Sequence, residues 1–393
     1  MQDRRPPDDY FRQSVSGVDT VEHARSPVGR VGDYLVASGR QRKNSDRTGV
    51  AMSFLLMSNA YSCVLSIFVA VMLVIPTATT AETPQWSTAA WQPAPADVVP
   101  SAYANVGTFS TTSLHIGGGL IQVVLLDGPT SVPRTAILHW ISNAAEALSD
   151  YHQKFPVPNV TIMVLTNDLR GIHGGRTIGG RLIRITVGQQ TTQADLDADW
   201  VMVHEMIHLS FPNLDKRLLW MEEGLATYLE PVMRARHGLM PTTTAWHDLV
   251  DGLPRGQPQD GDQGLDGTPT WGRIYWGGAG FWLMVDLHIR EQTHNTKSID
   301  DVLRGILAAG GDGAASWTIE QVIAEAQRAT GTPVVGELYH SMALAPVPID
   351  LSGTWQRLGV VVESGTLRFD DQAPQAAIRL AITAQNQTER HVK

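Results

Sequence analysis

The chain has 393 residues, 43% of them hydrophobic, which is enough to bury a sizeable core. Its net charge at pH 7 is −9 and no stripe of basic residues occurs along it, so we expect no nucleic-acid partner. The single cysteine, Cys63, lies in an uncharged N-terminal stretch, so the rest of the chain offers no disulfide, no thiol nucleophile and no thiolate metal ligand.

The first 105 residues divide into three segments by composition. Residues 1–50 are polar without helical or strand periodicity, so we expect a disordered leader. Residues 51–81 carry no charge and include a dense apolar run, which predicts an export signal, either cleaved or retained as a membrane anchor through residues 51–75. Residues 82–105 contain four prolines and predict a linker. The expected location is periplasmic, extracellular or membrane-anchored.

Residues 106–350 are expected to form one domain of two lobes, which opens with strands and a helix. Short β-like runs occupy residues 106–127, and a strand bounded by turn residues is expected over 160–165. Between them, residues 133–151 space their apolar side chains three and four apart, which predicts a helix with one buried face. Residues 351–393 form a C-terminal extension that the sequence does not assign.

A glycine-rich stretch, 171–180, precedes a strand expected over 181–187. Glycines permit another backbone to approach closely, so this stretch is a candidate for contact with a ligand. A phosphate-binding loop is the competing interpretation, but no helix follows directly and the lysine of such loops is missing. We therefore favour close backbone approach over phosphate binding.

Residues 201–209 predict a buried helix that carries the pattern H-E-x-x-H. His204 and His208 are one helical turn apart on the same face, a geometry that suits two nitrogen ligands of one zinc ion. Glu205 lies beside them, where a carboxylate can act as general base on a water activated by the metal. Two histidines on an apolar face can also be ordinary core residues with satisfied nitrogens, so a third ligand is needed to decide.

A second helix is expected over residues 219–230 and contains the acidic pair Glu222 and Glu223. The pattern W-x-x-E-G-x-x-x-Y-x-E on this helix, after H-E-x-x-H, resembles the gluzincin metallopeptidases, in particular the aminopeptidase N and glycyl aminopeptidase families. Its matching residues are Trp220, Glu223, Gly224, Tyr228 and Glu230. The resemblance implies that Glu223 is the third zinc ligand, with Glu222 as the fallback.

A third block, residues 271–279, leads into an apolar helix expected over 280–290. It is similar to the gluzincin segment Y-x-K-G-A, whose tyrosine stabilises the oxyanion. Tyr275 takes the position of that tyrosine, and Gly277 stands where the family has lysine. The resemblance covers roughly residues 160–310.

The resemblance implies an α+β fold like that of thermolysin. It has a small sheet with antiparallel edges, active-site helices and a mainly helical C-terminal lobe, and the last strand before the metal helix is the sheet edge to which a substrate adds. The implied activity is zinc-dependent hydrolysis of peptide or protein substrates. The family motif G-x-M-E-N, whose Glu grips a free amino terminus, has no counterpart, because no Glu occurs between Leu169 and Val203. The alternative is a non-catalytic, zinc-containing envelope protein that binds peptides or partner proteins; the oligomeric state is not indicated.

Five further features carry smaller expectations. Thr227 is expected to hydrogen-bond a ligand histidine, and Arg273 either grips a substrate carboxylate or forms a structural ion pair. The Gly/Asp/Pro-rich residues 251–269 are long enough to form a lid or the rim of a cleft. Ser298 and Thr318 are expected to cap two helices of the second lobe.

Overall fold

The computed structural model describes residues 90–95 and 98–385. All described residues belong to one unit within Glu82–Lys393. The expected leader (1–50) and export segment (51–81) lie outside the described residues, so both stay predictions. None of the helices in the described ranges combines the length and the apolar character needed to cross a membrane.

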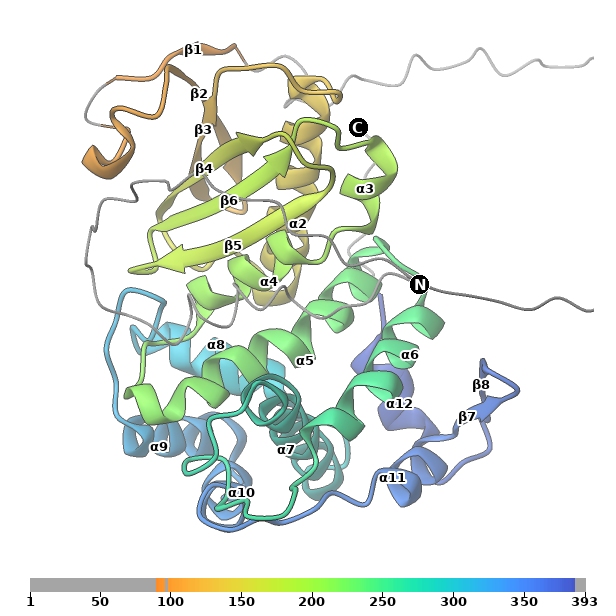
Figure 1. The fold of residues 1–393 in the computed structure, drawn as a ribbon. Helices are drawn as coiled ribbons and strands as arrows, with labels where there is room; N and C mark the ends of the chain where they lie inside the picture. Colours follow the sequence, from red (N-terminus) through yellow and green to blue (C-terminus); the bar gives the residue numbers. More distant parts are fainter. Residues whose placement is uncertain (1–89, 96–97, 386–393) are drawn as a thin grey trace, which may run out of the picture. The chain divides into compact units, whose positions relative to one another are not determined.

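A six-stranded mixed sheet is formed by the first strands of the described unit (Figure 1). The spatial order is β1-β2-β3-β4-β6-β5, and the strands are β1 Gln92–Pro93, β2 Phe109–Ile116, β3 Gly119–Leu126, β4 Asn159–Asn167, β5 Ile172–Ile178 and β6 Leu182–Gly188. β2 with β3 and β5 with β6 are antiparallel, whereas β3–β4 and β4–β6 are parallel. Parallel neighbours need a crossover, which helix α2 (Arg134–His152) supplies between β3 and β4.

The sheet edge that lies nearest the helices of the candidate site is β5, the strand formed by the glycine-rich stretch. The expectation that the last strand before the metal helix forms this edge is wrong, because that strand, β6, lies between β4 and β5. The side chains explain the order. Ile183, Ile185 and Val187 of β6 are fully buried, which suits an interior strand, whereas the glycines and Arg176 of β5 suit an edge.

Part of the segment expected to be a linker packs on the sheet. Gln92–Pro93 pairs with β2 as the short edge strand β1. Apolar residues of the same segment then cover a buried cluster of the sheet: Ala94, Val98, Val99 and Tyr103 pack against Phe109, Val124 and Met163. Burial of these side chains, rather than the proline content, decides the structure of this segment.

Helices make up most of the remainder, which confirms the predicted α+β class. They are α3 Gln193–Ala198, α4 Val201–Ile207, α5 Leu219–His237, α6 Thr242–Gly252, α7 Gly278–Gln292, α8 Ile299–Ala308, α9 Ile319–Thr330, α10 Val334–Met342, α11 Leu351–Leu358 and α12 Ala376–Ile382. Both expected capping boxes are present, Ser298 with Asp301 on α8 and Thr318 with Gln321 on α9. Helix α4 lies between the sheet and α5, and α5 in turn contacts α7 (Figure 1).

The C-terminal extension, described up to residue 385, joins the helical part of the unit. It contains α11, the hairpin β7 Val360–Glu363 and β8 Thr366–Phe369, and α12. The backbone oxygen of Ile382 accepts a 2.7 Å hydrogen bond from Nε of Arg236 on α5, and Trp246 on α6 donates to Thr383. Two buried donors of the expected catalytic domain therefore depend on the extension for their acceptors.

The long connection 251–269 is held against the core. Asp262 and Arg273 form a 2.8 Å ion pair whose side chains are only 2% and 5% exposed. Asp266 accepts hydrogen bonds from Nε1 of Trp220 and from the hydroxyl of Tyr339. Of the two interpretations of Arg273, the structure therefore shows the ion pair.

Candidate metal centre

The helix α4 carries its polar residues inside the core. His204 is 1% exposed and Glu205 2% exposed, and their neighbours Val203 and Met206 are buried as well. The α-helix ends at Ile207, so His208 opens a 3-10 turn instead of continuing the helix to residue 209 as expected. His208 nevertheless remains one turn from His204, with ring centroids 5.2 Å apart.

Helix α5 brings Glu223 to the two histidines, and Gly224 allows α7 to pack closely against α5. A Cβ on Gly224 would lie 2.3 Å from the backbone of Gly278, and a Cβ on Gly278 would lie 2.0 Å from the carbonyl oxygen of Trp220. Only glycine fits at both positions, because the backbones of α5 and α7 touch there. This contact holds the start of α7, and with it the preceding turn, beside α5.

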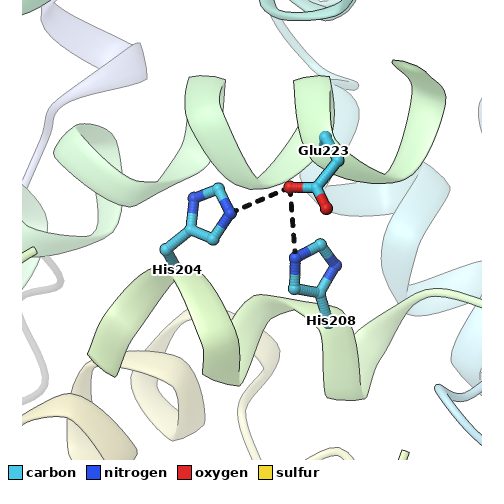
Figure 2. A group of neighbouring side chains, drawn as sticks. All are labelled: His204, His208 and Glu223. Atoms are coloured by element: carbon cyan, nitrogen blue, oxygen red, sulfur yellow. Dashed lines mark hydrogen bonds and ion pairs between the residues drawn. The ribbon is translucent and has the colours of Figure 1, made fainter. Parts of the chain in front are cut away.

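The three expected ligands converge (Figure 2). Oε2 of Glu223 lies 3.2 Å from Nε2 of His204 and 3.7 Å from Nε2 of His208. One ligand atom from each side chain can be chosen so that all three lie within 4.8 Å of one another. Figure 2 shows a single carboxylate oxygen directed at a ring nitrogen of each imidazole.

These distances match the requirements of a tetrahedral zinc ion. Bonds of about 2.0–2.1 Å at tetrahedral angles place neighbouring ligand atoms about 3.3 Å apart. The two histidine–carboxylate separations, 3.2 and 3.7 Å, lie close to that value. Two imidazoles and one carboxylate are also a ligand set that catalytic zinc sites use. His204, His208 and Glu223 could therefore hold zinc with little rearrangement.

The charges of His204, His208 and Glu223, here called the ligand trio, depend on one another. Burial alone would raise the pKa of Glu223, but the neighbouring His208 and the hydrogen bond with His204 outweigh it and hold the pKa below its ordinary value. Burial alone would lower the pKa of His204, yet the hydrogen bond and charge of Glu223 raise it. At His208 burial prevails and lowers the pKa. The lowered pKa values favour the ionised carboxylate of Glu223 and the neutral imidazole of His208, the forms in which both side chains bind a metal.

The fallback ligand, Glu222, is engaged elsewhere. Its carboxylate accepts a 2.9 Å hydrogen bond from the backbone N–H of Leu214, and burial raises its pKa to about 7. The expectation for Thr227 is wrong, because its hydroxyl donates to the backbone oxygen of Glu223 at 2.7 Å and not to a histidine. A threonine in a helix commonly bonds the carbonyl four residues earlier, which explains the difference.

Tyr275 reaches the site from a π-helical turn, Gly272–Gly277, that runs directly into α7. Its ring stacks on His204 with centroids 6.3 Å apart and an interplanar angle of 27°. Tyr275 is also among the groups that lower the pKa of Glu223, so this tyrosine lies near the Glu223 carboxylate. Turns of this kind are frequent at functional sites.

Glu205 has a partner that the sequence did not indicate. The hydroxyl of Thr177 on β5 lies 2.9 Å from Oε2 of Glu205 and 2.7 Å from its backbone oxygen. The two residues are 28 apart in the chain, and the only signal near Thr177 was the run of glycines around it.

The expected core residues of the signature are buried, with Trp220 1% exposed and Tyr228 fully enclosed.

Comparison with known proteins bears on the fold. No family model matches the sequence, and no curated protein matches it. An aminopeptidase N family protein from Idiomarina loihiensis has a TM-score of 0.52 at 15% identity, over 65% of this chain and 50% of that chain. Over the matched part, the chain has the fold of this aminopeptidase N family protein.

The M1 zinc metallopeptidase from Deinococcus radiodurans gives a TM-score of 0.41 at 15% identity, over 66% of this chain and 54% of that chain. A mutant of that enzyme bound to a Tyr-Ser-Ala substrate also gives 0.41, at 14% identity, over 67% and 53%. The chain therefore spans about half the length of the solved structures it resembles. The resemblance to aminopeptidase N expected from the sequence is confirmed at the level of the fold.

Proposed function

We propose that this protein is an exported zinc-dependent metallopeptidase that hydrolyses peptide or protein substrates. The observation that carries the proposal is the convergence of His204, His208 and Glu223 on two packed helices. Glu205 lies on the same helix as the two histidines, and a purely structural metal site needs no such carboxylate. The aminopeptidase N fold supports the same conclusion. Export is supported by the uncharged segment 51–81.

We also propose the two-lobed arrangement of thermolysin-like peptidases. In this arrangement the sheet, α2 and α4 form one lobe, and the helices from α7 onward form the other. Helix α5 contacts both α4 and α7, which is how Glu223 and Tyr275 come to the same site. The support is therefore the packing of these helices around the ligand trio.

Each polar residue of the site then has one role. His204, His208 and Glu223 hold zinc, which when bound lowers the pKa of a water molecule toward about 7 and polarises the scissile carbonyl. Glu205 accepts the proton of the attacking water and passes it to the nitrogen of the leaving amine. The hydroxyl of Tyr275 donates a hydrogen bond to the carbonyl oxygen of the substrate as negative charge develops there, a contact worth about 3 kcal/mol of barrier.

The substrate is proposed to bind as an extended peptide along β5. This strand ends the sheet and contacts α4, so its outer backbone groups can pair with a peptide beside the metal ligands. β5 contains His173 and Arg176 but no carboxylate. A free amino terminus thus finds no acidic partner on this strand, and we expect the enzyme to accept peptides without one.

The test uses the full chain and a library of peptides with free and blocked amino termini. We expect one zinc per chain by elemental analysis and hydrolysis that a chelator abolishes and added zinc restores. Glu205→Gln should keep the zinc and lose hydrolysis by about a hundredfold or more. Glu222→Gln is the matched control, because it changes the neighbouring buried carboxylate that is not directed at the histidines, and it should keep both properties.

Two results would contradict the proposal. One is a chain that binds zinc stoichiometrically but hydrolyses no peptide in the library, which would support the non-catalytic envelope protein. The other is hydrolysis that is as fast in Glu205→Gln as in the unmodified protein, because the proposed proton acceptor would then be unnecessary.

A further inference from the structure

Two residues of the edge strand β5 hold the carboxylate of Glu205. The hydroxyl of Thr177 lies 2.9 Å from Oε2 of Glu205. Gly175, two residues earlier, packs against the same side chain, because a Cβ at this position would lie 2.6 Å from Cγ and 2.8 Å from Oε1 of Glu205. The carboxylate therefore has a hydrogen-bond donor at one oxygen and backbone against the other.

The strand register explains why both residues face the helix. Thr177 pairs with Ile183 of β6, and directly opposed residues of antiparallel strands point to the same side of a sheet. Ile183 is fully buried, so Thr177 projects toward the buried face that α4 covers. The register shifts between His173 and Arg176, where a bulge brings Gly175 against Glu205.

We propose that Thr177 and Gly175 position the carboxylate of Glu205 for proton transfer, an inference that rests on the proposed peptidase function. Proton transfer requires the accepting oxygen to stay within hydrogen-bond reach of the attacking water, and small misplacements of a reacting group are costly in rate. A hydroxyl that donates to Oε2 restricts the rotation of the carboxylate about its last bond. Thr177 is thus a positioning residue, and it couples the proposed substrate-binding strand to the proposed base.

A purely structural role for Thr177 has a different expectation. The same hydroxyl also lies 2.7 Å from the backbone oxygen of Glu205, a contact that fastens β5 to α4. Loss of that contact alone would lower stability or substrate affinity without lowering the rate of the chemical step. The two roles are therefore distinguished by whether the loss of the Thr177 hydroxyl lowers kcat or only raises KM.

The kinetic experiment compares three variants of the full, zinc-loaded chain. Thr177→Val keeps the shape and removes the hydroxyl, and Thr177→Ser keeps the hydroxyl. Thr186→Val is the matched control on β6, where Thr186 pairs with His173 and lies on the other face of the sheet from Ile183 and Ile185. We expect Thr177→Val to lower kcat about tenfold with KM changed by less than about threefold, since hydrogen bonds to charged groups are worth about that factor or more.

Thr177→Ser should return kcat to within about threefold of the unmodified protein, and Thr186→Val should leave it unchanged. Zinc content should remain one per chain in all three, because neither threonine is among the three proposed ligands. An unchanged kcat in Thr177→Val, or a Thr177→Ser variant as slow as Thr177→Val, would overturn the positioning role.

A second measurement does not depend on hydrolysis. Melting temperatures of the metal-free protein are compared for Thr177→Val, Glu205→Met and the double variant. The hydroxyl of Thr177 has one proton for the backbone oxygen and Oε2 of Glu205, and in Glu205→Met only the backbone oxygen remains. If the hydroxyl contacts the carboxylate, the effects should therefore fail to add by about 2 °C. If the changes in melting temperature add, the Thr177 hydroxyl does not interact with the Glu205 side chain, and the proposal is wrong. If the effects do not add but the unmodified protein hydrolyses no peptide, the contact stands and the peptidase function fails.

Discussion

A buried histidine that is not one of the three proposed ligands makes the unfolding free energy of this protein sensitive to acid. His152 closes helix α2, is 3% exposed, and stacks edge-on against Tyr151 at 5.0 Å. Neither of its ring nitrogens has a hydrogen-bond partner among the described residues. Burial lowers its pKa from 6.5 to about 3, and the charge of Asp300 opposes this shift while the charges of Arg304 and Lys154 assist it.

The size of the effect follows from the difference between the folded and unfolded pKa values. Below pH 6.5 the unfolded chain binds a proton at His152 that the folded protein does not bind. The unfolding free energy is therefore undiminished above pH 6.5 and falls as the pH drops toward 3. At about 1.4 kcal/mol for each pKa unit, the full loss is about 5 kcal/mol, and about 2 kcal/mol is already lost at pH 5.

The assay is urea unfolding at pH 7.5 and at pH 5, in a chelator, for the unmodified protein and for His152→Phe. The unmodified protein should lose about 2 kcal/mol more than the variant between the two pH values, since titrating groups at the ligand trio act in both proteins and cancel. His340→Phe, which alters an exposed histidine on α10, should behave like the unmodified protein. An acid loss as large in His152→Phe as in the unmodified protein would refute the reasoning.

Three further predictions concern the site and the packing around it. Tyr275→Phe should lower kcat about a hundredfold while zinc content stays at one per chain, and a change below about threefold would remove Tyr275 from the proposed mechanism. Gly224→Ala should lower the unfolding free energy by about 2 kcal/mol or more in urea, because its Cβ would lie 2.3 Å from the backbone of Gly278. Gly336→Ala, whose Cβ would meet only a side-chain carbon of Ile323 at 3.0 Å, is the control and should change stability by less than about 1 kcal/mol. Peptides with an acetylated amino terminus should be hydrolysed within about threefold of the rate of free peptides, because β5 carries no carboxylate; strict dependence on a free terminus would contradict that.

The helices around the site were predictable because their signals are local. The spacing of His204 and His208 sets the face of the helix from which both imidazoles project. The capping boxes at Ser298 and Thr318 each lie within four residues and appear where the sequence placed them. Such patterns depend on the period of the helix and on backbone groups close by, so no distant partner is needed to interpret them.

Other features were predicted wrongly, or not at all, because they depend on pairing between distant segments. β5 lies at the edge because β6 pairs in parallel with β4, and the sequence of neither strand alone predicts this pairing. The ion pair of Arg273 with Asp262 and the packing of Val98 and Val99 on the sheet belong to the same class. Burial stabilises the apolar packing, whereas the ion pair offsets the cost of burying two charges, and only the assembled fold brings either set of partners together.

The sequence by itself determined which side chains are chemically able to hold a metal and to move a proton, since H-E-x-x-H and the later Glu223 specify donor types and their helical phase. Only the tertiary structure decided that Oε2 of Glu223 lies 3.2 Å from His204, and that a threonine from an edge strand contacts Glu205. The physical reason is that helical phase repeats every few residues, whereas the distance between two helices, or between a strand and a helix, depends on how the whole core packs.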